Sequence, residues 1–128
     1  MKRTLTFLAA AILLTLSAFA PAQNLDGVIG ALNTGNAAGI ARYVGDKVEI
    51  GLPDKKGSYN STQAAAVLKD FFSANGVRAF KTVHKGDKGG KQFCIGTLQT
   101  LSGNYRTQIL MESKGGRDYI KLLSFQAE

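Results

Sequence analysis

The sequence predicts an α+β domain in which a curved antiparallel sheet wraps around a central helix. Apolar residues recur at three- and four-residue spacing in the middle of the chain, which indicates helices, and at every second residue in the last third, which indicates strands. Short glycine-containing turns separate the alternating segments, so successive strands are expected to pair as an antiparallel meander. Helices on one side of such a sheet form a layered α+β architecture.

The start of the chain predicts a secretory signal peptide at residues 1–22. Lys2 and Arg3 precede an apolar run that ends in small residues, as at a cleavage site. The run is too short and wrongly flanked for a stable membrane span. We therefore expect one domain at residues 23–128, exported to the periplasm or beyond the cell, with no membrane anchor.

The net charge and the single cysteine limit which partners and which covalent links the chain can have. The formal net charge is +7, and +5 without the predicted signal peptide. Basic residues cluster at strand ends and turns, where charge discourages edge-to-edge aggregation. An exported address argues against nucleic acid as the partner. Cys94 is the only cysteine, so no internal disulfide can form, and its place in an apolar strand predicts a small buried side chain.

Two short helices and one strand are predicted before the central helix. The first helix ends at Gly35, and Asn36 can cap a second over residues 37–44. Residues 48–52 alternate between apolar and other side chains, which predicts a half-buried strand. Residues 54–57 are expected to form a polar turn. The first helix is predicted from the helical spacing of Leu25, Val28, Ile29 and Leu32.

The central helix has the strongest local signals in the chain. Asn60 or Ser61 can cap its first turn, and Gln63 completes a weak capping box. Asn75 and Gly76 supply the left-handed residue that commonly ends a helix. A broad apolar stripe on one side is formed by Ala64, Val67, Leu68, Phe71 and Phe72.

Four strands are predicted after this helix, at residues 80–85, 91–100, 105–112 and 118–125. Gly96 interrupts the second of them and predicts a bulge or bend. Glycine bends allow such a sheet to curl around the central helix, which leaves a cone with an open end.

Both faces of the predicted sheet carry apolar side chains. Phe93 and Ile95 point to one side of their strand, whereas Cys94 and Leu98 point to the other. Because the helices can cover only one face, the other would be left exposed, and such apolar patches often mark interfaces. We expect a homodimer through that face.

Several short motifs lie along the mature chain, at residues 35–36, 56–59, 63–64, 68–72, 84–86, 95–98 and 103–106, together with Phe80 and Ile120. In these motifs the sequence resembles a family of small secreted bacterial proteins of unknown function in the nuclear transport factor 2-like superfamily, whose cystatin-like α+β fold is cone-shaped. The resemblance covers the whole mature chain, and it implies that fold. It supplies no activity or binding residues, because the family has none assigned, and fold alone does not determine function.

His84 is the one candidate general base, because it is the only histidine. Simple alternation places it on the same strand face as Phe80 and Thr82. A catalytic role would require His84 inside the cone, within hydrogen-bonding reach of Tyr43 or Tyr105. A lone histidine is weak evidence for a site, so a structural histidine is the competing interpretation.

The sequence contains no motif for a metal site, a catalytic nucleophile or a phosphate-binding loop. One histidine and one cysteine are a poor metal-ligand set, so no metal site is expected. No nucleophile motif is present. The glycine-rich segment at residues 86–91 lacks the spacing of a phosphate loop, and Gln92 stands where serine or threonine is required. No cofactor is expected.

The sequence therefore favours an exported, non-enzymatic binding or interaction module, whose cone holds a small apolar ligand or whose sheet meets a protein partner. One alternative is a small lyase or isomerase that uses His84. Another is a purely structural dimer in which Phe71, Phe72 and Phe80 fill the cone. The residues expected to line a ligand site are Tyr43, Phe72, Phe80, His84 and Tyr105.

Overall fold

The computed structural model describes residues 24–128, so the predicted signal peptide lies outside the described residues. The elements follow the predicted order of helices and strands, with one short strand added. They are α2 (Asn24–Thr34), α3 (Ala37–Ala41), β1 (Val44–Gly51), β2 (Lys56–Tyr59), α4 (Ser61–Asn75), β3 (Val77–Lys88), β4 (Lys91–Thr100), β5 (Gly103–Lys114) and β6 (Arg117–Ala127).

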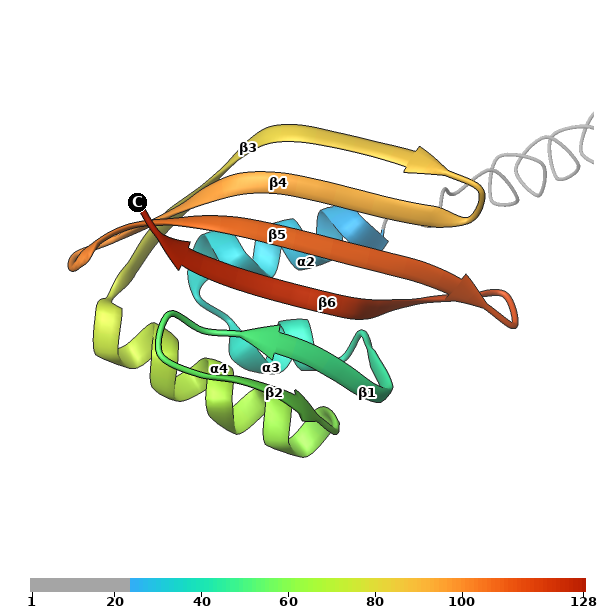
Figure 1. The fold of residues 1–128 in the computed structure, drawn as a ribbon, viewed down its shortest axis with the longest axis horizontal. Coiled ribbons are helices and arrows are strands. Elements are labelled where there is room, and N and C mark those ends of the chain that lie inside the picture. The colour runs from blue at the N-terminus through green and yellow to red at the C-terminus, as the bar shows by residue number, and fades with distance from the viewer. Residues whose placement is uncertain (1–23) are drawn as a thin grey trace, which may run out of the picture.

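One six-stranded sheet runs in the order β2-β1-β6-β5-β4-β3. Strands β3 to β6 pair in succession as an antiparallel meander, which confirms the prediction for the second half of the chain. One pairing departs from the predicted antiparallel sheet, because β1 lies parallel to β6. Figure 1 shows all three helices on one side of the curved sheet. We call the face toward them the inner face and the opposite one the outer face.

Helix α4 begins and ends as its sequence predicts. The Asn60 side chain accepts a hydrogen bond from the Gln63 amide (2.9 Å), and the Gln63 side chain accepts one from the Asn60 amide (3.1 Å), which completes a capping box. Gly76 ends the helix with a φ of 71°. The Ser61 hydroxyl donates to the carbonyl of Ala41 (3.0 Å), which fastens the start of α4 to the end of α3.

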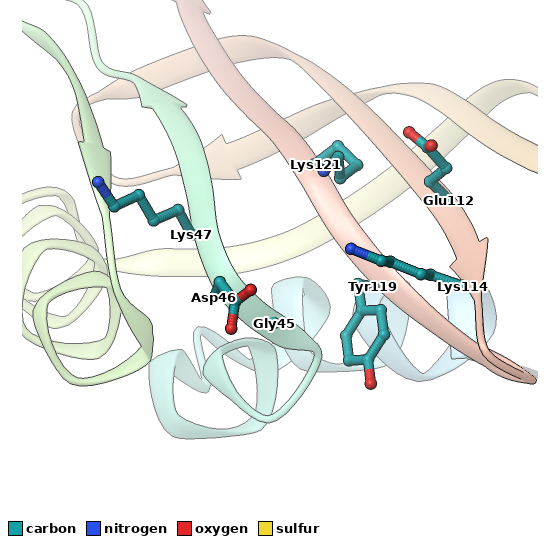
Figure 2. Close-up of a pocket in the computed structure, with 7 residues that line it drawn as sticks. All are labelled: Gly45, Asp46, Lys47, Glu112, Lys114, Tyr119 and Lys121. Carbon is teal, nitrogen blue, oxygen red and sulfur yellow. The ribbon is translucent and has the colours of Figure 1, made fainter.

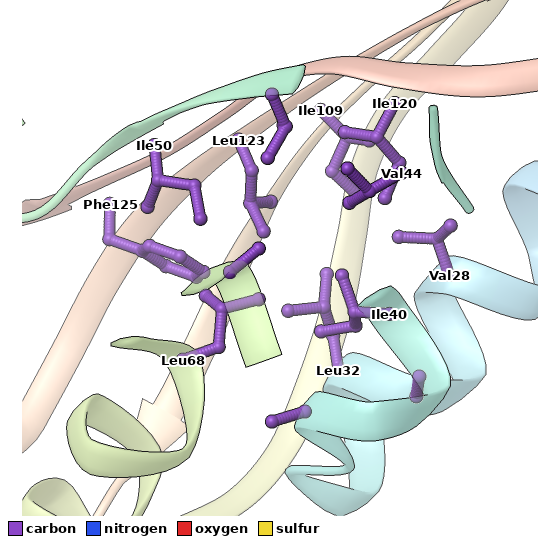
Figure 3. Close-up of a cluster of buried hydrophobic side chains, with 14 of the residues drawn as sticks. Val28, Leu32, Ile40, Val44, Ile50, Leu68, Ile109, Ile120, Leu123 and Phe125 are labelled. Carbon is purple, nitrogen blue, oxygen red and sulfur yellow. The ribbon is translucent and has the colours of Figure 1, made fainter. Parts of the chain in front are cut away.

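The hydrophobic core lies between the inner sheet face and the three helices (Figure 3). Leu68 of α4 and Leu32 of α2 are both fully buried there. The ring centroid of Phe125 from β6 lies 4.9 Å from the ring centroid of Phe71 and 6.1 Å from that of Phe72. Core side chains therefore occupy the interior of the cone.

Two boundary predictions were wrong at the same edge of the sheet. The second helix ends at Ala41, because Val44 begins β1 and its position pairs with Ile120 of β6. The predicted turn at residues 54–57 is shorter than expected, because Lys56 already pairs with Gly51 at the start of β2. Cross-strand hydrogen bonding decides both cases, and it has no local sequence signal.

A β-bulge in β3 reverses the direction of its side chains. Thr82 pairs with Gly96 but His84 pairs with Ile95, so Val83 is an extra residue. Val83 is 71% exposed. The sequence predicted a bulge or bend at Gly96 of β4, and the structure confirms an irregularity at this level of the sheet. The extra residue, however, lies on the neighbouring strand β3. A side chain at Gly96 would collide with the Phe80 ring and lie 2.6 Å from the Lys81 carbonyl oxygen.

Another bulge lies in β6. Leu110 pairs with Leu122 and Met111 pairs with Ile120, so Lys121 is the extra residue. Ile120 is therefore buried on the inner face, whereas Leu122 is on the outer face and only partly covered.

Candidate functional site

The outer face carries a set of partly exposed apolar side chains, which we call the outer row. Phe93 of β4 pairs with Leu110 of β5, which pairs with Leu122 of β6, so the three share one level of the sheet. Ile95 lies two residues from Phe93 on the same face. All four are partly covered, whereas their neighbours Cys94, Ile109 and Leu123 are buried on the inner face. The predicted division of β4 into two apolar faces is thus confirmed.

Polar groups surround the outer row. At the β1 end of the row, Leu122 of β6 pairs with Glu49 of β1, whose side chain is exposed. Beside Leu122 the face is hollowed over Gly51, and this hollow of ≈ 490 Å³ is lined by polar side chains that include Gln108 and Ser124. An apolar centre with a polar, wet rim is the usual composition of a protein–protein interface.

His84 lies on the outer face, so the prediction that it shares a face with Phe80 and Thr82 was wrong. The extra residue Val83 shifts the alternation by one position, as a bulge must when side chains alternate with a period of two. The His84 imidazole is exposed, and its ring centroid lies 5.4 Å from that of Phe93. His84 therefore extends the outer row toward β3.

The sheet separates His84 from the other predicted site residues. Phe72 and Phe80 are buried in the core, with 4% and 7% of their surface exposed. Tyr43 packs against the same core, and its hydroxyl lies beside Gly27 of α2. The structure thus does not bring the five predicted residues together. In particular, His84 does not meet Tyr43 or Tyr105 inside the cone, which is the geometry that the lyase alternative requires.

Tyr105 lines a pocket of ≈ 350 Å³ beside the C-terminal half of α4. We call it the mouth pocket. The Tyr105 hydroxyl donates to the Asn75 side-chain oxygen (2.8 Å), and the Asn75 amide group donates to the Phe71 carbonyl (2.8 Å). The pocket is lined by Leu52, Pro53, Asp54, Lys55, Val67, Asp70, Phe71, Ala74, Asn75 and Tyr105.

The mouth pocket combines an apolar surface with a few fixed polar groups. The rings of Phe71 and Tyr105 meet edge to face, with centroids 5.2 Å apart. Asn75 holds the tyrosine hydroxyl in place at the rim. Such a surface suits an amphipathic molecule that buries its apolar part against the rings and directs its polar part to the rim. The sequence analysis missed Asn75, because its contact with Tyr105 spans 30 positions of the chain.

Two titratable groups in the described residues have shifted pKa values. Burial raises the pKa of the Cys94 thiol, which keeps it protonated and unreactive at neutral pH. A hydrogen bond from Lys85 to the Asp26 carboxylate (2.8 Å) raises the pKa of that lysine on the exposed surface. Within residues 24–128, no three His, Cys, Asp or Glu side chains gather in a way that could hold a metal ion.

Comparison with known proteins identifies the family. The model of DUF4783, a domain of unknown function, matches residues 25–126. The chain belongs to this family. A DUF4783 protein from Bacteroides uniformis is 29% identical in sequence and superimposes with a TM-score of 0.77, over 80% of this chain and 95% of that one. No curated protein matches.

More distant structures establish the wider fold of this DUF4783 chain. An NTF2-like protein of unknown function from Cytophaga hutchinsonii is 13% identical, with a TM-score of 0.60 over 82% of this chain and 87% of that one. A cystatin-like domain of unknown function from Nostoc punctiforme is 12% identical, with a TM-score of 0.65 over 82% and 73%. The predicted NTF2-like, cystatin-like α+β fold is confirmed. In the described part of the chain, no helix has the length and apolar character needed to cross a membrane.

Proposed function

We propose that this DUF4783 protein is an exported, non-catalytic interaction module that forms a homodimer through its outer sheet face. The observation that carries the proposal is the outer row, in which apolar side chains from β4, β5 and β6 stand side by side with no helix over them. The buried interior of the cone supports an interaction role, because the core already occupies the space in which a reaction would take place.

The polar groups at the ends of the outer row favour a second copy of the chain as the occupant. Glu49 stands at the β1 end and His84 at the β3 end. A two-fold axis parallel to β5 would place Leu110 near the centre of the interface. It would also set Glu49 of each copy opposite His84 of the other, where a carboxylate can accept a hydrogen bond from an imidazole N–H.

Leu110→Glu is expected to convert the dimer to a monomer. A carboxylate at the centre of an apolar interface loses its hydration without a partner, and the loss of a central anchor commonly costs more than about 2 kcal/mol, or about 30-fold in the dissociation constant. Sedimentation velocity over a concentration series measures the change. Circular dichroism should show an unchanged fold, because Leu110 is only partly buried.

Leu101→Glu is the matched control, since Leu101 is 74% exposed in the turn between β4 and β5, away from the outer row. This variant should remain dimeric. A wild-type protein that stays monomeric at the highest concentrations would refute the proposal. So would equal dissociation of the two variants, because the effect would then be one of net charge.

The mouth pocket favours a second role, binding of a small amphipathic molecule. Native mass spectrometry of the purified protein should detect bound mass. Ala74→Phe, which introduces a ring at a pocket-lining position on α4, should abolish it. Ala66→Phe makes the same change at an exposed position of α4 outside the pocket lining and should retain the ligand. This role would be contradicted if the Ala74→Phe variant still carried the extra mass of a bound ligand, or if the wild-type protein carried none.

A further inference from the structure

Strand β1 leaves the sheet over a short stretch, and a pocket opens there. Val44 pairs with Ile120 and Glu49 pairs with Leu122, so on the β6 side residues 45–48 of β1 stand against Lys121 alone. Gly45, Asp46 and Lys47 have no register partner on β2 or β6. These three residues line a pocket of ≈ 440 Å³ at this irregular stretch of β1.

Positive charge dominates the lining of this pocket, which we call the lysine pocket (Figure 2). Three lysines line it, Lys47, Lys114 and Lys121, against two carboxylates, Asp46 and Glu112. Within residues 24–128 the ion pair between Lys85 and Asp26 is the one present, so these five charges do not neutralise one another by direct contact. The local excess of positive charge attracts anions, and a recess bordered by protein screens it less than open solvent would.

The geometry assigns unequal roles to the lysines. Figure 2 shows Lys114 and Lys121 on the β5–β6 side of the pocket, whereas the ammonium group of Lys47 is directed away toward β2. The ring of Tyr119 supports β1 at Gly45, because a Cβ atom there would lie 3.2 Å from it. A larger residue at position 45 would therefore push β1 away from the pocket.

We propose that the lysine pocket binds a small anion, the carboxylate or phosphate group of a soluble ligand. Lys114 and Lys121 supply the charge, and the irregular segment of β1 at residues 45–47 forms the opposite wall of the pocket. This site is separate from the mouth pocket, and its occupancy does not require the proposed homodimer.

The test is an amide chemical-shift titration of the purified protein with inorganic phosphate and, separately, with acetate, at constant ionic strength. Saturable shifts are expected in residues 45–47 and at Tyr119. Lys114→Gln and Lys121→Gln should each weaken binding by about 1.5- to 5-fold, the range for single exposed charges. Glu112→Gln should strengthen it, because it removes a competing negative charge. Tighter binding of phosphate would identify a phosphate ligand, and tighter binding of acetate a carboxylate.

Lys69→Gln on α4 is the control, with the same loss of charge on an exposed surface outside the lysine pocket. It should leave the affinity unchanged. Three results would overturn the proposal: shifts that never saturate, shifts spread evenly over all surface lysines, or equal weakening by Lys69→Gln and Lys121→Gln. Each would show non-specific attraction to a basic protein.

Discussion

Phe125→Ala is expected to lower the free energy of unfolding by about 3–5 kcal/mol. Phe125 is 1% exposed and packs against the rings of both Phe71 and Phe72 of α4. Its loss removes the buried apolar surface and leaves a cavity between the sheet and the helix. Urea denaturation measures the effect as a lower midpoint at an unchanged slope.

Phe93→Ala is the matched control at protein concentrations low enough to dissociate the proposed dimer, where the same atoms are removed from the partly exposed outer face. Its cost should be about 1 kcal/mol, in proportion to the smaller area removed from water. A single domain has only about 5–15 kcal/mol of stability, so Phe125→Leu, which retains most of the side chain, provides a milder second variant. Equal destabilisation by Phe125→Ala and Phe93→Ala would contradict the placement of the hydrophobic core between the inner sheet face and the helices.

Gly96→Ala is expected to destabilise the protein by about 1–3 kcal/mol, the range for added atoms in a packed site. The new methyl group would meet the Phe80 ring and lie 2.6 Å from the Lys81 carbonyl oxygen, so backbone must move. The bulge at Val83 would be displaced with it. Thermal unfolding measures the loss of stability, and altered amide shifts of Val83 and His84 would report the displaced bulge.

Gly30→Ala makes the same substitution in α2, where nothing lies within 4 Å of the added atom. It should stabilise the protein by up to about 1 kcal/mol, since alanine is a better helix former than glycine. The two variants thus have opposite expected signs. If Gly96→Ala were neutral, the tight contact between β3 and β4 at the bulge would be disproved.

Local signals in the sequence were sufficient for most of the elements. Helix α4 was predicted within a residue of its ends, because Asn60, Gln63 and Gly76 act within a single turn of helix. The meander from β3 to β6 followed from alternation and glycine turns. The position of Cys94 and Phe93 on opposite faces of β4 followed from the side-chain period of a strand.

The candidate site depended on features with no local signal. The parallel pairing of β1 with β6 joins residues more than seventy positions apart, and the loss of register there opens the lysine pocket. The contact between Tyr105 and Asn75 likewise joins two separate elements.

What the sequence by itself determined about this protein is its secondary structure, its α+β class and the alternation of its strands, because capping, propensity and periodicity act over a few neighbouring residues. Only the tertiary structure decided which face His84 occupies. One inserted residue, Val83, reverses every side chain that follows it until the end of the strand. A bulge is a property of two paired strands, so neither strand alone contains it, and the place of the histidine follows from the pairing.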